Sequence, residues 1–495
     1  MKKLSLISAC LGISLLSTSC LPHGVDDKAE SRIKLASKRF DSTNPSSASS
    51  LELEQDDKHI KSLKPFRKFW LRFNDPSLSA LIEHAMQQNF DLRAGLARIE
   101  NARGLSTQIN AARYPTLSAA GTATYGRSLN PAIGSVTVMN ANGSLPIRYE
   151  ADLFARYRAT GNAAEFEVQA SILDWLSMRI MLAADITESW YNYVLARDSV
   201  ELIEDQIEAN TEYLGLLEAR VDKGLAPEVD VNQQKQLLWA SNKNREAAVL
   251  ERDLALQQLQ LLVVTFPNNS AKTFLTHAQQ KLPVVPVEEQ IQISGAQLQD
   301  RPDVKAARLR VTAADYSVGS RIAEYYPSLT FNIVPGYSWL RVESDSGNRE
   351  IQGFTFNAGA ELSLPIFDGF LRSGQVKQNE AVLSERIEEL NQKTLAALIE
   401  TRSALLSEQG YRRIVDAADN ELLAAQAVLR DAKKRYELGV TDFVPVLLAL
   451  QSDQSKSLEV LRAKRQLISA RIDLYRALGG DIGPKKPQAA SLSSE

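Results

Sequence analysis

The chain contains two copies of one structural unit, and this duplication narrows the folds open to it. The segment Tyr114–Ser118 matches Tyr326–Thr330 at an offset of 212, and Arg220–Leu225 matches Arg435–Val440 at an offset of 215. An offset that barely drifts along the chain indicates a tandem duplication. We place the first copy at residues 78–264 and the second at residues 299–479, with a linker at residues 265–298 between them.

Each copy is expected to be built around very long helices. There is no proline between Pro146 and Pro227, and none between Pro365 and Pro445. Since an interior proline breaks a helix, such stretches permit uninterrupted ones. A helix of about 65 residues would be roughly 100 Å long. In both copies we expect a helix up to the Tyr-Pro pair, a stretch of small and aromatic residues, a long helix, a turn at glycine and a second long helix.

Apolar residues in the long helices follow a heptad pattern. Such spacing keeps long helices side by side, and its many alanines allow a close approach. The same seam recurs in the second copy after adding 215, although an elongated helical bundle would fit these helices equally well. The seam residues are Ile203, Ile207, Asn210, Leu214, Leu217 and Val221 in the first copy, and Ala418, Leu422, Ala425, Leu429, Ala432 and Tyr436 in the second.

The stretches before the long helices alternate between apolar and polar residues, which predicts strands with one apolar face. We place these strands at about residues 115–154 and 327–366, two in each copy, with a polar loop from Arg341 to Glu350. Tyr337 and Trp339 suit an interfacial aromatic belt. The clearest alternation joins Leu329, Phe331, Ile333, Phe354, Phe356 and Leu362 with Thr330, Asn332, Thr355, Asn357 and Glu361.

Segments of this length and pattern are typical of membrane β-barrels, with polar side chains in a water-filled lumen. The charged residues on the polar faces would be costly in lipid and tolerable in such a lumen. Four strands cannot close a barrel, and an open edge is not stable in lipid, so the chain must form oligomers. Soluble half-buried hairpins are the alternative. The candidate lumen residues are Arg148, Glu150, Asp152 and Glu361.

The N-terminus reads as a secretory signal. Lys2 and Lys3 precede an apolar run from Leu4 to Leu16, and Ser17-Thr18-Ser19 lead to Cys20. The run is too short to span a membrane. Cysteine at this place resembles a bacterial lipobox, which predicts cleavage of residues 1–19, lipidation of Cys20 and an anchor with an extended segment at residues 20–77. An ordinary signal with an incidental cysteine is the alternative.

The composition offers little for catalysis or metal binding. The chain has two cysteines, four histidines and a net charge of −3, so it shows no basic excess for nucleic acid. It has no phosphate-binding loop, no H-E-x-x-H and no nucleophile elbow. We therefore expect a protein that is not an enzyme and needs no cofactor or metal.

Taken together, these features resemble the TolC-like outer-membrane factor family, in its lipoprotein branch of drug-efflux outer-membrane components (NodT-type). The resemblance runs from about Phe69 to Gly480. Its motifs are Cys20, Trp70 with Asn74–Leu78, the two Tyr-Pro-x-Leu segments, Asp152-Leu153-Phe154, Gln299–Val304 and Leu364–Gly369.

The family resemblance implies a mostly α fold with a membrane β-barrel portion, assembled as a homotrimer with a twelve-strand barrel and a helical tunnel in the periplasm. It also implies a periplasmic adaptor, an inner-membrane transporter of the RND type and outer-membrane lipid as partners. The function implied is a passive exit duct for small toxic compounds. A duct for type I protein secretion and a non-conducting periplasmic scaffold are the alternatives.

The two glycine turns are the expected docking sites for the adaptor, on the strength of that resemblance. Gly224 and Gly439 suit left-handed helix caps, while Pro227 and Asp442 suit the first turn and the N-cap of the helices that follow. Leu225 and Val440 complete the two turns. Residues 480–495 are expected to form a loose tail.

Relatives narrow the tunnel with acidic residues six and nine places after the second glycine. Here these places hold Pro445 and Leu448, so the acidic pattern is missing. In the first copy the matching places hold Asp230 and Gln233. We therefore expect a ring of Leu448 side chains to close the aperture by excluding water.

Overall fold

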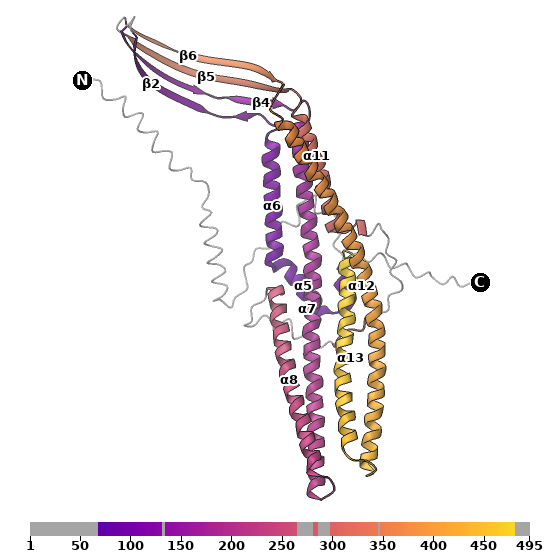
Figure 1. The fold of residues 1–495 in the computed structure, drawn as a ribbon. Helices are drawn as coiled ribbons and strands as arrows, with labels where there is room; N and C mark the ends of the chain where they lie inside the picture. Colours follow the sequence, from indigo (N-terminus) through magenta and orange to yellow (C-terminus); the bar gives the residue numbers. More distant parts are fainter. Residues whose placement is uncertain (1–67, 131–133, 265–280, 286–297, 345–346, 481–495) are drawn as a thin grey trace, which may run out of the picture. The chain divides into compact units, whose positions relative to one another are not determined.

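The computed structural model describes residues 68–130, 134–264, 281–285, 298–344 and 347–480 (Figure 1). By its contacts the chain divides into residues 1–56 and residues 57–495, and every described residue belongs to the second unit. The predicted signal peptide, Cys20, most of the extended segment and the linker, and all of the tail beyond Gly480 lie outside the described residues.

The described part of the chain begins with a short 3-10 helix that precedes the first copy, followed by two α-helices, strands and two long helices. Asp75 caps α5, because its carboxylate accepts hydrogen bonds from the backbone nitrogens of Ser77 and Leu78. Pro76 occupies the first turn of that helix. The elements are η1 (Phe69–Phe73), α5 (Pro76–Gln88), α6 (Phe90–Ala111), β1 (Thr116–Leu117), β2 (Ala120–Asn130), β3 (Gly134–Ser144), β4 (Ile147–Ala151), α7 (Arg156–Asp222) and α8 (Glu228–Val263).

The second copy repeats this order from α6 onward. Helices α6 and α11 both contain 22 residues, and α7 and α12 both contain 67, so the two long uninterrupted helices predicted from the proline spacing are confirmed. The elements are α11 (Pro302–Ala323), β5 (Ser328–Ser344), β6 (Gly347–Ser363), α12 (Leu371–Glu437) and α13 (Val444–Ala477).

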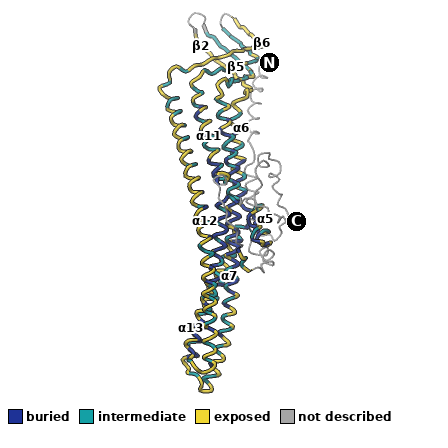
Figure 2. The backbone as a smooth tube through the Cα atoms, turned by 90° about the vertical axis from the view of Figure 1, so that its right-hand side faces the viewer, coloured by how far each residue is buried: buried dark blue, intermediate teal, exposed yellow. Residues whose placement is uncertain are grey.

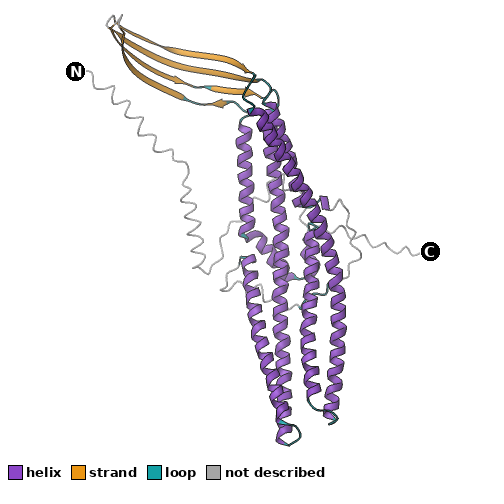
Figure 3. Cartoon of the chain, in the orientation of Figure 1, coloured by secondary structure: helices purple, strands orange, loops and turns teal. Residues whose placement is uncertain are grey.

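Strands gather at one end of the long helices, and both glycine turns lie at the other (Figure 3). Helix α7 packs against α6, α8, α11 and α13, and α12 packs against α11 and α13. The buried residues concentrate in the middle of these helices (Figure 2). There Trp70, Trp190, Tyr191 and Tyr475 are almost fully buried in one apolar cluster.

The heptad seam lies at the helix contacts, as predicted. Ile203, Asn210 and Leu217 are buried, as are Ala418 and Leu429 in the second copy. Asn210 makes the seam specific, because it donates to Ser241 Oγ at 3.0 Å and accepts from Gln454 Nε2 at 3.0 Å. A buried polar residue of this kind fixes the register between helices.

All strands of the described residues belong to one antiparallel sheet. Strands β4 and β3 pair with successive stretches of β5, so the two act as one interrupted strand, and β1 and β2 lie beside them in the same way. The sheet therefore has four strand positions, as predicted, and β2 and β6 are its free edges.

The polar loop expected from Arg341 to Glu350 is mostly strand instead. Strand β5 continues to Ser344 and β6 begins at Gly347. Arg341 stands opposite Glu350 in the register, and Trp339 Nε1 donates to Glu350 Oε1 at 2.7 Å. The prediction of a loop was wrong because it rested on the polar side chains of this segment. A hairpin satisfies its backbone groups through the ladder even where its side chains are charged.

Candidate functional site

The sheet has two chemically different faces, which the pairing register defines. Residues directly opposite each other in a ladder project to the same side. Leu329 stands opposite Leu362, and Tyr337 opposite Phe354. Phe354 is 93% exposed in the single chain, so this apolar face is uncovered. It also carries Ile147, Tyr149, Phe331, Ile333, Trp339 and Phe356.

The opposite face carries the candidate lumen charges. Glu150 stands opposite Thr330, and Thr330 stands opposite Glu361, so the three residues form one row across three strands. Arg148 lies in the neighbouring row, opposite Asn332. The remainder of this face is mostly serine, threonine, asparagine and glycine, which suits contact with water.

Two of the candidate lumen carboxylates also hold the start of α7. Asp152 accepts hydrogen bonds from the backbone nitrogens of Tyr157 at 3.1 Å and Arg158 at 2.8 Å, so it satisfies free donors in the first turn. Glu150 binds Arg156 Nη2 and the Tyr157 hydroxyl, each at 2.7 Å. Sequence periodicity gave their face but could not show this second role.

The two glycine turns have the same geometry. Gly224 and Gly439 have φ values of 67° and 71°, in the left-handed region that favours glycine. The next residue in each turn donates its backbone N–H to a carbonyl five residues back, Leu225 to Arg220 at 2.8 Å and Val440 to Arg435 at 2.9 Å. The predicted left-handed caps are therefore confirmed.

The expected roles of Pro227 and Asp442 are corrected by the helix bounds. Pro227 is the N-cap of α8, one place before the first turn. The N-cap of α13 is Phe443, no side chain caps that helix, and Pro445 occupies its first turn. Phe443 is buried against Tyr436 with ring centroids 5.5 Å apart, so apolar packing fixes this turn where an aspartate cap was expected.

The candidate aperture residues are exposed at the start of α13. Leu448 is 60% exposed and Pro445 is also exposed, while their neighbours Val446 and Leu447 are buried against the other long helices. Such exposure in a single chain leaves Leu448 free to line a passage.

Two acidic residues, Asp230 near the first glycine turn and Asp442 in the second, repel each other. Asp230, in the first turn of α8, is buried, and burial together with the negative charge of Asp442 raises the pKa of its carboxyl group. The two residues belong to different copies of the duplicated unit. Their repulsion therefore acts between the turns, and it weakens when Asp230 takes up a proton.

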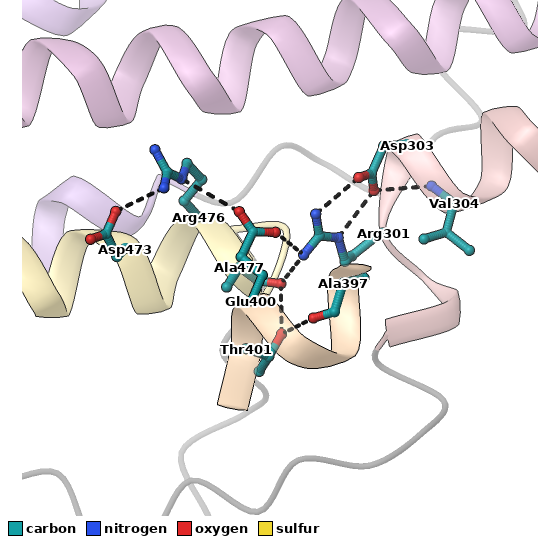
Figure 4. A network of polar contacts seen from close by, with 9 residues as sticks. All are labelled: Arg301, Asp303, Val304, Ala397, Glu400, Thr401, Asp473, Arg476 and Ala477. Carbon is teal, nitrogen blue, oxygen red and sulfur yellow. Dashed lines mark hydrogen bonds and ion pairs between the residues drawn. The ribbon is translucent and has the colours of Figure 1, made fainter. Parts of the chain in front are cut away.

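Arg301, at the start of α11, connects three helices through hydrogen bonds (Figure 4). The sequence alone did not predict this role. Arg301 Nη1 donates to the Ala477 carbonyl at 2.7 Å and to Glu400 Oε2 at 2.9 Å, and its Nη2 donates to Asp303 Oδ2 at 2.9 Å. Burial alone would raise the pKa of Asp303, but the hydrogen bonds and charge of Arg301 lower that pKa below its usual value.

The first copy has a matching contact in which an amide replaces the guanidinium group. Asn89, at the start of α6, donates its Nδ2 to the carbonyl of Leu262 in the last turn of α8, at 3.1 Å. Asn89 and Arg301 differ by the same offset of 212 that relates the two Tyr-Pro segments. In both copies, the start of one helix thus binds the end of another.

Among the described residues, no helix combines the length and the apolar character needed to cross a membrane. No group of three or more potential metal ligands occurs in that part of the chain.

Comparison with known proteins gives a consistent picture. The sequence is 25% identical over 425 residues to the solvent efflux pump outer membrane protein SrpC of Pseudomonas putida, covering 82% of this chain and 86% of that one. It is 24% identical over 410 residues to the probable outer membrane lipoprotein SilC of Salmonella typhimurium, covering 82% and 87%. The solved structure of the outer membrane protein VceC of Vibrio cholerae matches with a TM-score of 0.72 and 25% identity, covering 84% of this chain and 98% of that one.

The sequence model of one family, described as outer membrane efflux protein, matches residues 81–263 and 294–480. These two matches span most of the chain and contain the two-faced sheet, the long helices and both glycine turns. The chain belongs to the outer membrane efflux protein family.

Proposed function

We propose that the chain is the exit duct of a tripartite efflux system, conducting small toxic compounds passively through the outer membrane. The observation that carries this proposal is the sheet, with an uncovered apolar face, a polar face and two free edges. Free edges are not stable in lipid, so copies must join edge to edge. A homotrimer supplies twelve strand positions, a number within the range of membrane barrels.

Within that trimer, the polar face lines the lumen. Arg148, Glu150 and Glu361 then face water near the junction with the helices, and Asp152 lies beside them at the start of α7. Cys20 adds a lipid anchor in the outer membrane, consistent with the lipoprotein name of SilC. Because SrpC is named as part of a solvent efflux pump, small organic compounds are the first class of substrate to test.

The turns are proposed as docking sites for a periplasmic adaptor, which links the duct to an inner-membrane transporter of the RND type. Leu225 and Val440 occupy the same place in the two turns and are 65% and 69% exposed. Exposed apolar residues on rigid turns are suited to contact with a partner. Gly224, Pro227, Gly439 and Asp442 shape the backbone or rim of the same sites.

Gene deletion tests the efflux function. We expect a deletion strain to accumulate more of a fluorescent dye and of several antibiotics, and the wild-type gene to restore the lower level. Unchanged accumulation, together with loss of a secreted protein, would point instead to a protein-secretion duct. Unchanged accumulation and secretion with a non-conducting purified oligomer would point to a scaffold.

Substitution at the turns tests the docking sites separately. The double variant Leu225→Asp, Val440→Asp is expected to lose efflux while still forming the oligomer, because charged groups oppose apolar docking. Leu423→Asp, at an exposed place on α12 away from the turns, is the control for a general effect of surface charge on transport. Equal efflux by the turn variant and the wild type would contradict docking at these residues.

A further inference from the structure

The unpartnered side of α8 carries a stripe of exposed apolar residues, interrupted by Asn232, Gln236 and Lys243, that none of the helices described above covers. Its buried residues, such as Val231, Ala248 and Leu259, mark the side that packs against α7 and the core. At about 100° per residue, the exposed apolar residues fall on the opposite side. They are Val229, Trp239, Leu250, Leu254 and Leu261, and Trp239 is 73% exposed.

Helix α12 carries a second stripe of the same kind. Its buried residues, among them Ala397, Ala404 and Val415, mark the side toward α11 and α13. The residues about half a turn away are exposed. They are Leu395, Ile399, Leu406, Ala417, Ala424 and Val428, so this stripe is narrow where α12 nears its glycine turn.

The two stripes lie on the two flanks of the described helices. Helix α7 packs between α8 and α13, and α13 packs between α7 and α12, which leaves α8 and α12 at the ends of the row. The contact from Asn89 to Leu262 places the end of α8 at the start of α6, and α6 leads into β1 and β2. Helix α12 follows β6 directly. Each stripe therefore belongs to the same flank as one free edge of the sheet.

We propose that the stripe of α8 packs against the stripe of α12 in the next copy of the chain, with Trp239 seated over Ala424. The occupant is a second copy because the free edges β2 and β6 must also be joined by copies, and each stripe continues its edge. The proposal thus rests on the oligomeric duct proposed above and specifies the contacts within it.

The two glycine turns lie at the same end of the helices (Figure 1), so residues of α8 and α12 can be paired by counting from the turns. Counted in this way, the side chains of the two stripes are complementary in size. Trp239 is the twelfth residue of α8, and the twelfth residue back from the end of α12 lies between Ala424 and Val428. A bulky indole thus meets a small side chain. Leu261 falls by the same count close to Leu406. Large aromatic residues against small ones are typical anchors of interfaces.

Cysteine cross-linking of the purified outer-membrane protein tests whether these two helical positions lie close together in neighbouring copies. The double variant Trp239→Cys, Ala424→Cys carries one new thiol on each flank, so linkage joins different chains into a covalent trimer. The matched control is Trp239→Cys with Leu423→Cys, because Leu423 is exposed beside Ala424 but points about a quarter turn away. Each single variant controls for linkage through Cys20.

We expect at least about fivefold more covalent trimer from the 239–424 pair than from the 239–423 pair, since disulfides require Cα atoms within about 7 Å. Equal linkage, or preferential linkage of the control pair, in a sample whose mass shows an intact trimer would overturn the proposed contact while leaving the duct standing. If the wild-type chain is a monomer by mass, the oligomeric duct itself fails, and so does the contact.

A charge substitution provides a second measurement. Ala424→Arg is expected to lower the assembled fraction at least about fivefold, because it places a charge inside an apolar contact, while Leu423→Arg leaves assembly near wild type. Helix content measured by circular dichroism separates loss of assembly from loss of folding. Normal assembly of the folded Ala424→Arg variant would also contradict the proposal.

Discussion

Equivalent positions after the last helix of each copy adopt the same left-handed backbone conformation with different residues. The chain turns to the left-handed conformation just after α8 at Val264, with a φ of 58°, and just after α13 at Gly479, with a φ of 66°. These two residues differ by the offset of 215 that relates the long helices. Valine is a poor choice for this conformation because its branched side chain clashes with the backbone, whereas glycine has no such cost.

Replacing Val264 by glycine should therefore stabilise the protein. We expect Val264→Gly to raise the free energy of unfolding by about 1 kcal/mol, the strain relieved less the extra entropy of an unfolded glycine. Thermal unfolding in detergent measures the shift. Gly479→Ala should act in the opposite direction, since an added Cβ would also meet Arg301 Cγ at 3.3 Å. A lower midpoint for Val264→Gly would show that the valine side chain compensates for its strain.

Arg301 should contribute more to stability than a surface arginine. Arg301→Gln removes charge-assisted hydrogen bonds to Asp303, Glu400 and the Ala477 carbonyl, so we expect a loss of about 2 kcal/mol. Arg308→Gln, at an exposed place on α11, serves as the control and should change stability by less than about 0.5 kcal/mol. Chemical denaturation monitored by circular dichroism measures the free energy of unfolding of both variants. Equal losses would show that the hydrogen bonds of Arg301 add no stability beyond that of a surface arginine.

The contact between the helix pair α7/α8 and the helix pair α12/α13 is polar at one level and apolar at another. Around Asn210 it is a buried polar layer, in which Gln454 of α13 contacts α7 and Gln234 of α8 donates to the Asn210 carbonyl at 2.9 Å. Toward the turns it becomes an apolar cluster that includes Leu217, Val231 and Phe443. The polar layer fixes the register of the helices, while the turns are held by packing and opposed by the acidic pair.

Acidic pH should therefore tighten the turns. The raised pKa of Asp230 means that the folded chain holds this proton more firmly than the unfolded chain does, so stability falls as pH rises through that pKa. We expect Asp230→Asn to slow hydrogen exchange at the turns at neutral pH, with a difference from wild type that disappears near about pH 4. The same difference at both pH values would exclude the carboxyl group as its source.

Substitution of Leu448 tests the proposal that a ring of these side chains closes an aperture. If leucine side chains exclude water, Leu448→Asn should raise conductance in planar bilayers without changing ion selectivity, and Leu448→Asp should raise both conductance and preference for cations. The two variants are similar in size, so their comparison isolates the charge. Unchanged selectivity in Leu448→Asp would remove this residue from the passage.

At the scale of the whole molecule, the two faces of the sheet determine its place in the cell. Phe356 projects to the apolar face and its neighbour Asn357 to the polar face, and both are exposed in the single chain. A lipid environment would make these adjacent positions respond in opposite ways to charge.

Arginine scanning at these two positions tests the orientation of the sheet. We expect Phe356→Arg to reduce the assembled protein in the outer membrane severely, because arginine facing lipid costs about 2–4 kcal/mol near the midplane. Asn357→Arg should assemble normally and alter only conductance. The assembled fraction can be read from outer-membrane preparations on native gels, and similar loss in both variants would argue against a lipid-facing side.

The sequence alone determined the duplication, the long helices, the four strand positions and the left-handed glycine caps. These features follow from local rules, namely heptad and two-residue periodicity, the absence of proline and the freedom of glycine at positive φ. It failed at the hairpin from Arg341 to Glu350 and at the cap expected from Asp442, where side-chain polarity was a poor guide to backbone pairing and packing.

Only the tertiary structure could bring Arg301 to Ala477, Asn89 to Leu262 and Asp230 near Asp442, because these partners are distant in the sequence. It alone also showed which helical faces remain uncovered, since exposure depends on the packing of all the other helices. Periodicity defines the face of an element on which a residue lies, whereas the assembled fold decides what that face meets.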